Sequence, residues 1–202
     1  MQNFKNIIFD LGGVLIDWNP RYLLRKVFKD EAEMEYFLTY ICNDDWNAKQ
    51  DAGQTIAEAY QELSSLHPDK AHLIKTYHDR WPETLGGEIT GTVKILEKLK
   101  NNNLNLFALT NWSHETFPYA KKHFTFLNHF LDIVVSGTEK VIKPDHRIYE
   151  ILLTRNNLNA HESVFIDDRP INVEAAENIG ITGIHFTSAE NLELTLKQLG
   201  VL

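Results

Sequence analysis

Short runs of consecutive apolar residues recur along the chain and alternate with stretches of helical spacing. Runs of this length are typical of strands buried on both faces of a parallel sheet. Between them, apolar positions three residues apart, such as Val93, Leu96 and Leu99, predict crossover helices. The alternation predicts an α/β fold with a doubly wound parallel sheet. The apolar runs occupy residues 7–9, 104–109, 133–135, 164–166 and 181–186.

One interval, residues 18–87, breaks this alternation. It contains several helix-like stretches and no convincing strand. Thr55 and Glu58 have the spacing of a capping box, which predicts the start of a helix. We therefore expect an α/β core formed by residues 1–17 and 88–202, with an all-helical cap formed by residues 18–87. The expected cap helices are residues 21–28, 31–42, 55–66 and 69–81.

The composition is that of an ordinary globular protein. The 202 residues, 43% of them hydrophobic, exceed a typical domain of ~150 residues, which agrees with a core and an insert. The formal net charge of −8 argues against attraction to nucleic acid or to an anionic membrane surface. A single cysteine, Cys42, forbids an internal disulfide. With no signal peptide or membrane span recognisable, we expect a cytoplasmic protein.

Polar residues follow the apolar runs at the points where the expected strands end. In open α/β sheets, ligands bind beyond the carboxyl ends of the strands. Several carboxylates at one spot repel each other unless a cation intervenes, and Mg²⁺ prefers such oxygen ligands. Asp10 could then attack a phosphoryl group, with Lys143 and the Thr110 hydroxyl holding phosphate oxygens. The polar residues in question are Asp10, Thr110, Asn111, Lys143, Asp167 and Asp168.

These positions, in this order, resemble the four motifs of haloacid dehalogenase superfamily hydrolases, in particular capped phosphatases of the C1 type. The first motif corresponds to residues 10–14, which read Asp-Leu-Gly-Gly-Val, and the second to Thr110. The third corresponds to Lys143 with the following Pro-Asp, and the fourth to residues 167–168. The resemblance covers nearly the whole chain, and the helical insert follows the first motif as in that family.

The resemblance implies a mechanism. Asp10 would be the nucleophile and a Mg²⁺ ligand, the Gly12 carbonyl and Asp168 would be further ligands, and Asp167 would act through metal-bound water. Attack by Asp10 on phosphorus would form an aspartyl-phosphate, with Lys143 and the ion stabilising the equatorial oxygens. Water would then release phosphate.

The chain departs from the family at Gly12, where most of its phosphatases have an aspartate that protonates the leaving group. General acid catalysis of this kind contributes ~10²–10⁴-fold. Asp17 and His114 are candidate replacements. Some family members with an Asp-Leu-Gly motif resemble phosphatases of sugar 1-phosphates. The leaving oxygen of a sugar 1-phosphate is comparatively acidic and needs less help from a general acid, so a sugar phosphate is a reasonable substrate.

Three further residues are expected to contact the substrate: Asn111, Trp18 and Trp112, although most tryptophans simply pack. A cap closing over the site favours a small phosphorylated molecule. Two alternatives remain. One is a dehalogenase, which needs no metal, and the Asp167–Asp168 pair argues against it. The other is a binding domain that keeps the fold and the metal site without turnover.

Overall fold

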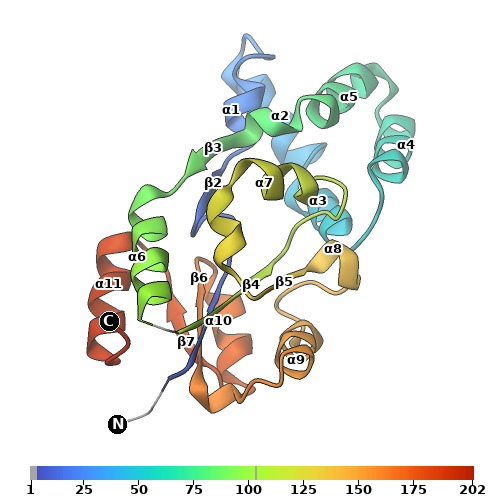
Figure 1. Cartoon of the computed structure of the whole chain (residues 1–202). Helices are drawn as coiled ribbons and strands as arrows, with labels where there is room; N and C mark the ends of the chain where they lie inside the picture. Colours follow the sequence, from blue (N-terminus) through green and yellow to red (C-terminus); the bar gives the residue numbers. More distant parts are fainter. Residues whose placement is uncertain (1–3, 103) are drawn as a thin grey trace.

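The computed structural model describes residues 4–102 and 104–202, and its centre is a five-stranded sheet in the order β5-β4-β1-β6-β7 (Figure 1). All neighbouring strands in it are parallel. The chain therefore winds outward from β1 in both directions, which confirms the predicted doubly wound α/β fold. The strands are β1 (Asn6–Phe9), β4 (Asn105–Thr110), β5 (Asp132–Val135), β6 (Ser163–Asp167) and β7 (Thr182–His185).

Helices cover both faces of this sheet because successive strand residues point to opposite sides. Ile7 and Phe9 pack in one buried cluster with apolar residues of α6 (Thr90–Asn101) and α11 (Ala189–Gln198). Ile8, between them, belongs to a second cluster with residues of α9 (His146–Arg155) and α10 (Pro170–Glu177). Burial on both faces explains why β1 reads as an unbroken apolar run.

Shorter helices connect these elements. They are α7 (Phe117–His123), η3 (Thr125–His129) and α8 (Ser136–Glu139) between β4 and α9, and η4 (Ala160–Glu162) before β6. α8 follows β5 directly, so it lies at the same edge of the sheet as the last residues of β1, β4 and β6.

A group of helices lies beyond the carboxyl ends of the strands (Figure 1). Thr55 caps α4 through the capping box predicted from the sequence. No helix within the described residues has the length and apolar character needed to cross a bilayer. The group comprises α1 (Arg21–Leu24), α2 (Glu31–Tyr40), α3 (Asp44–Asp51), α4 (Ile56–Leu66), η1 (Pro68–Lys70), α5 (Ala71–Asp79) and η2 (Trp81–Thr84).

The expectation that residues 18–87 contain no strand is wrong at both ends. β2 (Ile16–Trp18) and β3 (Leu85–Glu88) pair as an antiparallel ribbon through which the chain leaves the sheet and returns to it. Each strand is too short to produce a clear alternation, and two glycines in β3 weaken its propensity further. The ribbon therefore had no readable sequence signal.

The helix α3 was also not expected. Its sequence, Asp-Asp-Trp-Asn-Ala-Lys-Gln-Asp, has few apolar residues, and only Trp46 and Gln50 are buried. The Asn43 side chain accepts a hydrogen bond from the Trp46 N–H and caps the helix, a signal that is local and easily overlooked. Conversely, α1 ends at Leu24, four residues before the expected end.

Candidate active site

The carboxyl ends of three neighbouring strands bring the main polar residues together. Asp10 follows β1, Thr110 ends β4 and Asp167 ends β6, and β1 is paired with both of the other strands. All three residues are buried. A sheet edge thus places a hydroxyl and two carboxylates side by side although they are far apart in sequence.

Lys143 lies at the centre of this group. Its Nζ is 2.9 Å from Oδ1 of Asp10 and 2.7 Å from Oδ2 of Asp167, and it donates a hydrogen bond of 2.9 Å to the Leu109 carbonyl. Burial lowers the pKa of this ammonium, but the two carboxylates outweigh burial and raise the pKa above its ordinary value. Lys143 is therefore a permanent positive charge with all three protons directed at oxygen atoms.

The side chain of Asn111 holds the backbone of Lys143 in place. Its Oδ1 accepts a hydrogen bond of 2.8 Å from the Lys143 N–H, and its Nδ2 donates one of 3.0 Å to the Lys143 carbonyl. Asn111, predicted to contact substrate, thus uses both ends of its amide on the loop that carries the lysine.

Asp167 is held by the loop that begins α10. Its Oδ1 accepts hydrogen bonds from the Arg169 N–H at 2.8 Å and from Asn172 Nδ2 at 3.0 Å. The Asn172 carbonyl in turn accepts a hydrogen bond of 2.8 Å from the Tyr149 hydroxyl. These contacts fix the orientation of a side chain that is completely buried.

Asp10, Asp167 and Asp168 form a compact acidic cluster in which one oxygen of each lies within 4.8 Å of the others. Burial, then repulsion by Asp167, raises the pKa of Asp10 to about 7 in spite of the opposing charge of Lys143. Burial and the charge of Asp167 also raise the pKa of Asp168. Three hard oxygen ligands whose negative charges destabilise each other fit a divalent cation such as Mg²⁺.

The backbone after Asp10 makes room for this cluster. Gly13 has φ +75°, and a Cβ atom there would lie 2.5 Å from Oδ2 of Asp168. Its N–H donates a hydrogen bond of 2.9 Å to the Ile16 carbonyl, which closes a tight turn. Gly12, the predicted carbonyl ligand, is in the same turn, and a Cβ atom there would have no atom within 4 Å.

Thr110 contributes an unsatisfied hydroxyl. Its Oγ1 is buried and has no hydrogen-bond partner among the described residues. Leaving a buried polar atom unpaired costs roughly 1–3 kcal/mol. A ligand oxygen at the acidic cluster would satisfy it, as expected for a group that binds phosphate.

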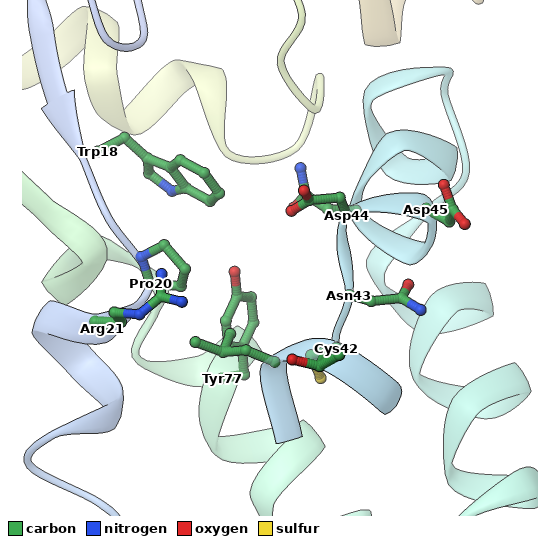
Figure 2. A pocket seen from close by; sticks show the side chains of 11 residues that line it. Trp18, Pro20, Arg21, Cys42, Asn43, Asp44, Asp45 and Tyr77 are labelled. Carbon is green, nitrogen blue, oxygen red and sulfur yellow. The ribbon is translucent and has the colours of Figure 1, made fainter. Parts of the chain in front are cut away.

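Trp18 lines a cavity of about 410 Å³ between the ribbon and the helices α1, α2, α3 and α5. Figure 2 shows its ring and the Tyr77 hydroxyl directed into the same space. Arg21 also lines this cavity, but both oxygens of Glu35 accept its hydrogen bonds at 2.6 Å. Asp44 and Asp45, both exposed, make the remaining charge of the cavity negative.

The other predicted tryptophan is in a different setting. Trp112 is buried against Trp81 and Phe117, and its indole N–H donates to the Thr116 hydroxyl at 3.0 Å. It therefore has the contacts of a packing residue and does not line the cavity of Trp18.

Two residues near the site were not singled out from the sequence as functional. Asp51, the last residue of α3, accepts a hydrogen bond of 3.1 Å from Asn47 Nδ2 and another from the Ser113 N–H. Ser136 Oγ donates to the Asp51 carbonyl at 2.6 Å and accepts from the Trp112 N–H at 2.9 Å. Nothing in the sequence indicates that α3 lies against α8, the contact that brings these two residues together.

The fold and this cluster define an α/β enzyme with a carboxylate-based site at the carboxyl edge of its sheet. The sequence matches the haloacid dehalogenase-like hydrolase family over residues 7–186. The chain therefore belongs to that family of hydrolases.

Similar proteins include a phosphatase and a nucleotidase. A sesquiterpene phosphatase of Aspergillus oryzae is 26% identical, over 97% of this chain and 96% of its own length. The GMP/IMP nucleotidase YrfG of Escherichia coli is 27% identical, over 89% of this chain and 81% of its own. Among solved structures, a haloacid dehalogenase family enzyme of Bacteroides thetaiotaomicron, bt-2542, superposes with a TM-score of 0.75 at 22% identity, covering 96% of this chain and 98% of that one.

Proposed function

We propose that this protein is a Mg²⁺-dependent phosphatase that hydrolyses a small phosphorylated metabolite through an aspartyl-phosphate on Asp10. One observation carries the proposal: the Lys143 ammonium binds both Asp10 and Asp167. Beside them, the unpaired hydroxyl of Thr110 is available to an incoming ligand. The proposed nucleophile therefore lies next to a positive charge and near an unpaired hydroxyl donor, which supports the proposal.

The geometry of Asp10 supports its role as nucleophile. Lys143 Nζ and the Leu11 N–H both contact Oδ1, at 2.9 and 2.7 Å, which leaves Oδ2 as the attacking oxygen. Attack forms the Oδ2–P bond and breaks the bond between phosphorus and the leaving oxygen, which takes up a proton. Water then attacks phosphorus, the bond to Asp10 breaks, and inorganic phosphate leaves.

Lys143 and Thr110 would bind the equatorial phosphate oxygens, where charge is spread in the transition state. Asp10, Asp168 and the Gly12 carbonyl would hold Mg²⁺, with Asp167 acting through a bound water. The ion, when bound, supplies positive charge that offsets the repulsion between the phosphate and the acidic cluster.

We further propose that residues 18–87 act as a cap that limits the substrate to a small molecule, while residues 1–17 and 88–202 form the catalytic core. The position of this helical segment beyond the strand ends supports the assignment (Figure 1). A lid in this position excludes water and polymeric substrates from the site.

The residues that line the cavity of Trp18 favour a substrate whose leaving group is neutral and hydroxylated, such as a sugar. The indole ring of Trp18 provides a flat apolar face, and acceptors such as Asp44 and Asn47 provide partners for hydroxyl groups. A second phosphate or carboxylate would be repelled by Asp44 and Asp45, since Glu35 already pairs with Arg21, the cation of the cavity lining. A hydrocarbon chain like that of a sesquiterpene would leave the same polar groups without partners.

Phosphate release from a panel of phosphorylated sugars, nucleotides, organic acids and terpenyl alcohols tests the proposal. We expect release with Mg²⁺, loss of release in EDTA, and loss of at least ~10³-fold in Asp10→Asn. Asp69→Asn, which alters an exposed carboxyl of η1, serves as the matched control and should retain activity.

Two outcomes would contradict it. Metal-independent release of halide from a 2-haloacid would instead establish a dehalogenase. Phosphorylated ligands that bind without turnover, equally in wild type and Asp10→Asn, would establish a binding domain.

A further inference from the structure

The leaving oxygen needs a proton, and the position two residues after the nucleophile cannot supply it because Gly12 has no side chain. Of the two replacements predicted from sequence, Asp17 of the ribbon accepts a hydrogen bond of 2.7 Å from the Tyr22 hydroxyl of α1. His114 has a buried, unpaired Nδ1, but no carboxylate or lysine is in hydrogen-bond contact with it among the described residues. A third group interacts with the positive charge of the site.

That group is Asp51, the last residue of α3, which lies against the edge of the sheet. The residue is half-buried, and its carboxyl accepts hydrogen bonds from the Ser113 N–H, in the loop after β4, and from Asn47 of its own helix. The positive charge of Lys143 acts on this carboxyl. Asp51 thus lies at the end of a helix of the helical segment, hydrogen-bonded to the loop after β4 and within electrostatic reach of Lys143.

The backbone of Asp51 is anchored to the core. Ser136 Oγ, at the start of α8, donates a hydrogen bond of 2.6 Å to its carbonyl. Two residues later Gly53 turns the chain with φ +102°, so close to α8 that a Cβ atom would lie 2.9 Å from Lys140 Cγ and 3.1 Å from the Gly137 carbonyl. The contacts with α8 hold the carboxyl in a defined position relative to Lys143.

Asn47 connects this carboxyl to the cavity. Its Nδ2 binds Oδ2 of Asp51, and the residue also lines the cavity of Trp18. A leaving group that extends from a phosphate at Lys143 towards that cavity would therefore approach Asn47 and its partner Asp51.

We propose that Asp51 is the general acid and base of this enzyme, an inference that rests on the proposed phosphatase function. As the bond between phosphorus and the leaving oxygen breaks, the protonated carboxyl of Asp51 transfers its proton to that oxygen. The carboxylate so formed accepts hydrogen bonds from Asn47 and the Ser113 N–H. It then takes a proton from the water that attacks the aspartyl-phosphate, which restores the protonated carboxyl and completes the cycle.

The electrostatics agree with this role. Burial raises the pKa of Asp51 to about 7, against the opposing effects of the Lys143 charge and the Ser113 N–H. A carboxyl with a pKa near neutrality can both give and take a proton at the pH at which the enzyme operates. An exposed carboxyl of ordinary pKa could serve only as a weak base.

Leaving groups of different basicity test the assignment. With glycerol 2-phosphate, whose alkoxide needs a proton, kcat/KM of Asp51→Asn should fall about 10²–10³-fold. With p-nitrophenyl phosphate, whose phenolate leaves without a proton, it should fall less than about 5-fold. A rapid burst of p-nitrophenolate should persist while steady turnover slows, because hydrolysis of the aspartyl-phosphate has lost its base.

Controls separate this role from a structural one. Asp51→Glu keeps the carboxyl and should recover part of the glycerol 2-phosphate activity, and Asp69→Asn should behave as wild type. Equal losses for both esters in Asp51→Asn, or no loss for glycerol 2-phosphate, would overturn the assignment. The assignment would also be overturned if His114→Gln, and not Asp51→Asn, lost kcat/KM for glycerol 2-phosphate alone. If wild type releases phosphate from neither ester, the proposed function itself fails.

Discussion

Replacement of Lys143 by methionine tests the electrostatic centre of the site, because methionine keeps the length of the side chain but removes its charge. The ammonium has only 1% of its side-chain surface exposed and contacts three oxygens, of Asp10, Asp167 and Leu109, at 2.7–2.9 Å. Without it, two buried carboxylates face each other with no positive charge between them. Breaking a buried ion pair in this way costs roughly 3–5 kcal/mol of the free energy of unfolding.

The loss of unfolding free energy in Lys143→Met should depend on pH and on Mg²⁺. Because the pKa of Asp10 is already raised to about 7, lowering the pH through this value protonates it and removes part of the repulsion. The destabilisation by Lys143→Met should therefore be larger at pH 8 than at pH 6. Added Mg²⁺ should reduce it, since the ion replaces the missing positive charge.

Urea unfolding followed by tryptophan fluorescence, at pH 8 in EDTA, measures this difference. In a thermal scan, 3–5 kcal/mol corresponds to a fall in Tm of roughly 6–20 °C for a protein of this size. Lys98→Met is the matched control: this lysine is 54% exposed and pairs with Glu193 at the surface, so its loss should cost less than about 1 kcal/mol. A change below about 1 kcal/mol for Lys143→Met as well would refute our account of the charge balance.

Three further predictions concern the pH dependence of stability and the turn after Asp10. Burial lowers the pKa of His78 from 6.5 to about 4, so the unfolded chain binds a proton that the folded one resists. Stability should therefore fall as pH drops from 6.5 to 4, by about 3 kcal/mol at most, and difference curves against His78→Phe should isolate this effect. Gly13→Ala should lower both Tm and Mg²⁺-dependent activity, because its Cβ would collide with Asp168, whereas Gly12→Ala should be tolerated; equal effects in thermal scans would argue against this steric explanation. Gly12→Asp, placed in open space beside the nucleophile, should restore at least about 10-fold of the activity lost in Asp51→Asn, as steady-state assays of the double variant would reveal.

The residues that sequence could predict are those whose position follows from the sheet alone. Asp10 and Asp167 end buried apolar strands, and the carboxyl ends of neighbouring parallel strands meet at one edge. Thr110 is brought to that edge by the same rule, with no knowledge of side-chain packing. Lys143 follows from its motif, although the clamp by Asn111 that positions it was not expected.

What could not be predicted depends on how segments distant in sequence pack together. Asp51 has no distinguishing signal in the sequence, and only the packing of α3 against α8 brings it within electrostatic reach of Lys143. The sequence does not distinguish Trp112 from Trp18 as a substrate contact. In the structure Trp112 packs against Trp81, whereas Trp18 lines the cavity. Tertiary packing, which leaves no periodic signal, decided both outcomes.

The ribbon of β2 and β3 has a mechanical consequence. Both crossings between the sheet and the helices of residues 21–84 run through two strands that are hydrogen-bonded to each other, with Trp18 beside Leu85. A rigid displacement of these helices relative to the sheet would therefore rotate them about the ribbon. The Ser136 hydrogen bond and the contacts of Gly53 with α8 hold Asp51 against the core, so such a displacement would break these contacts and move Asp51 away from Asp10, which follows β1 in the sheet.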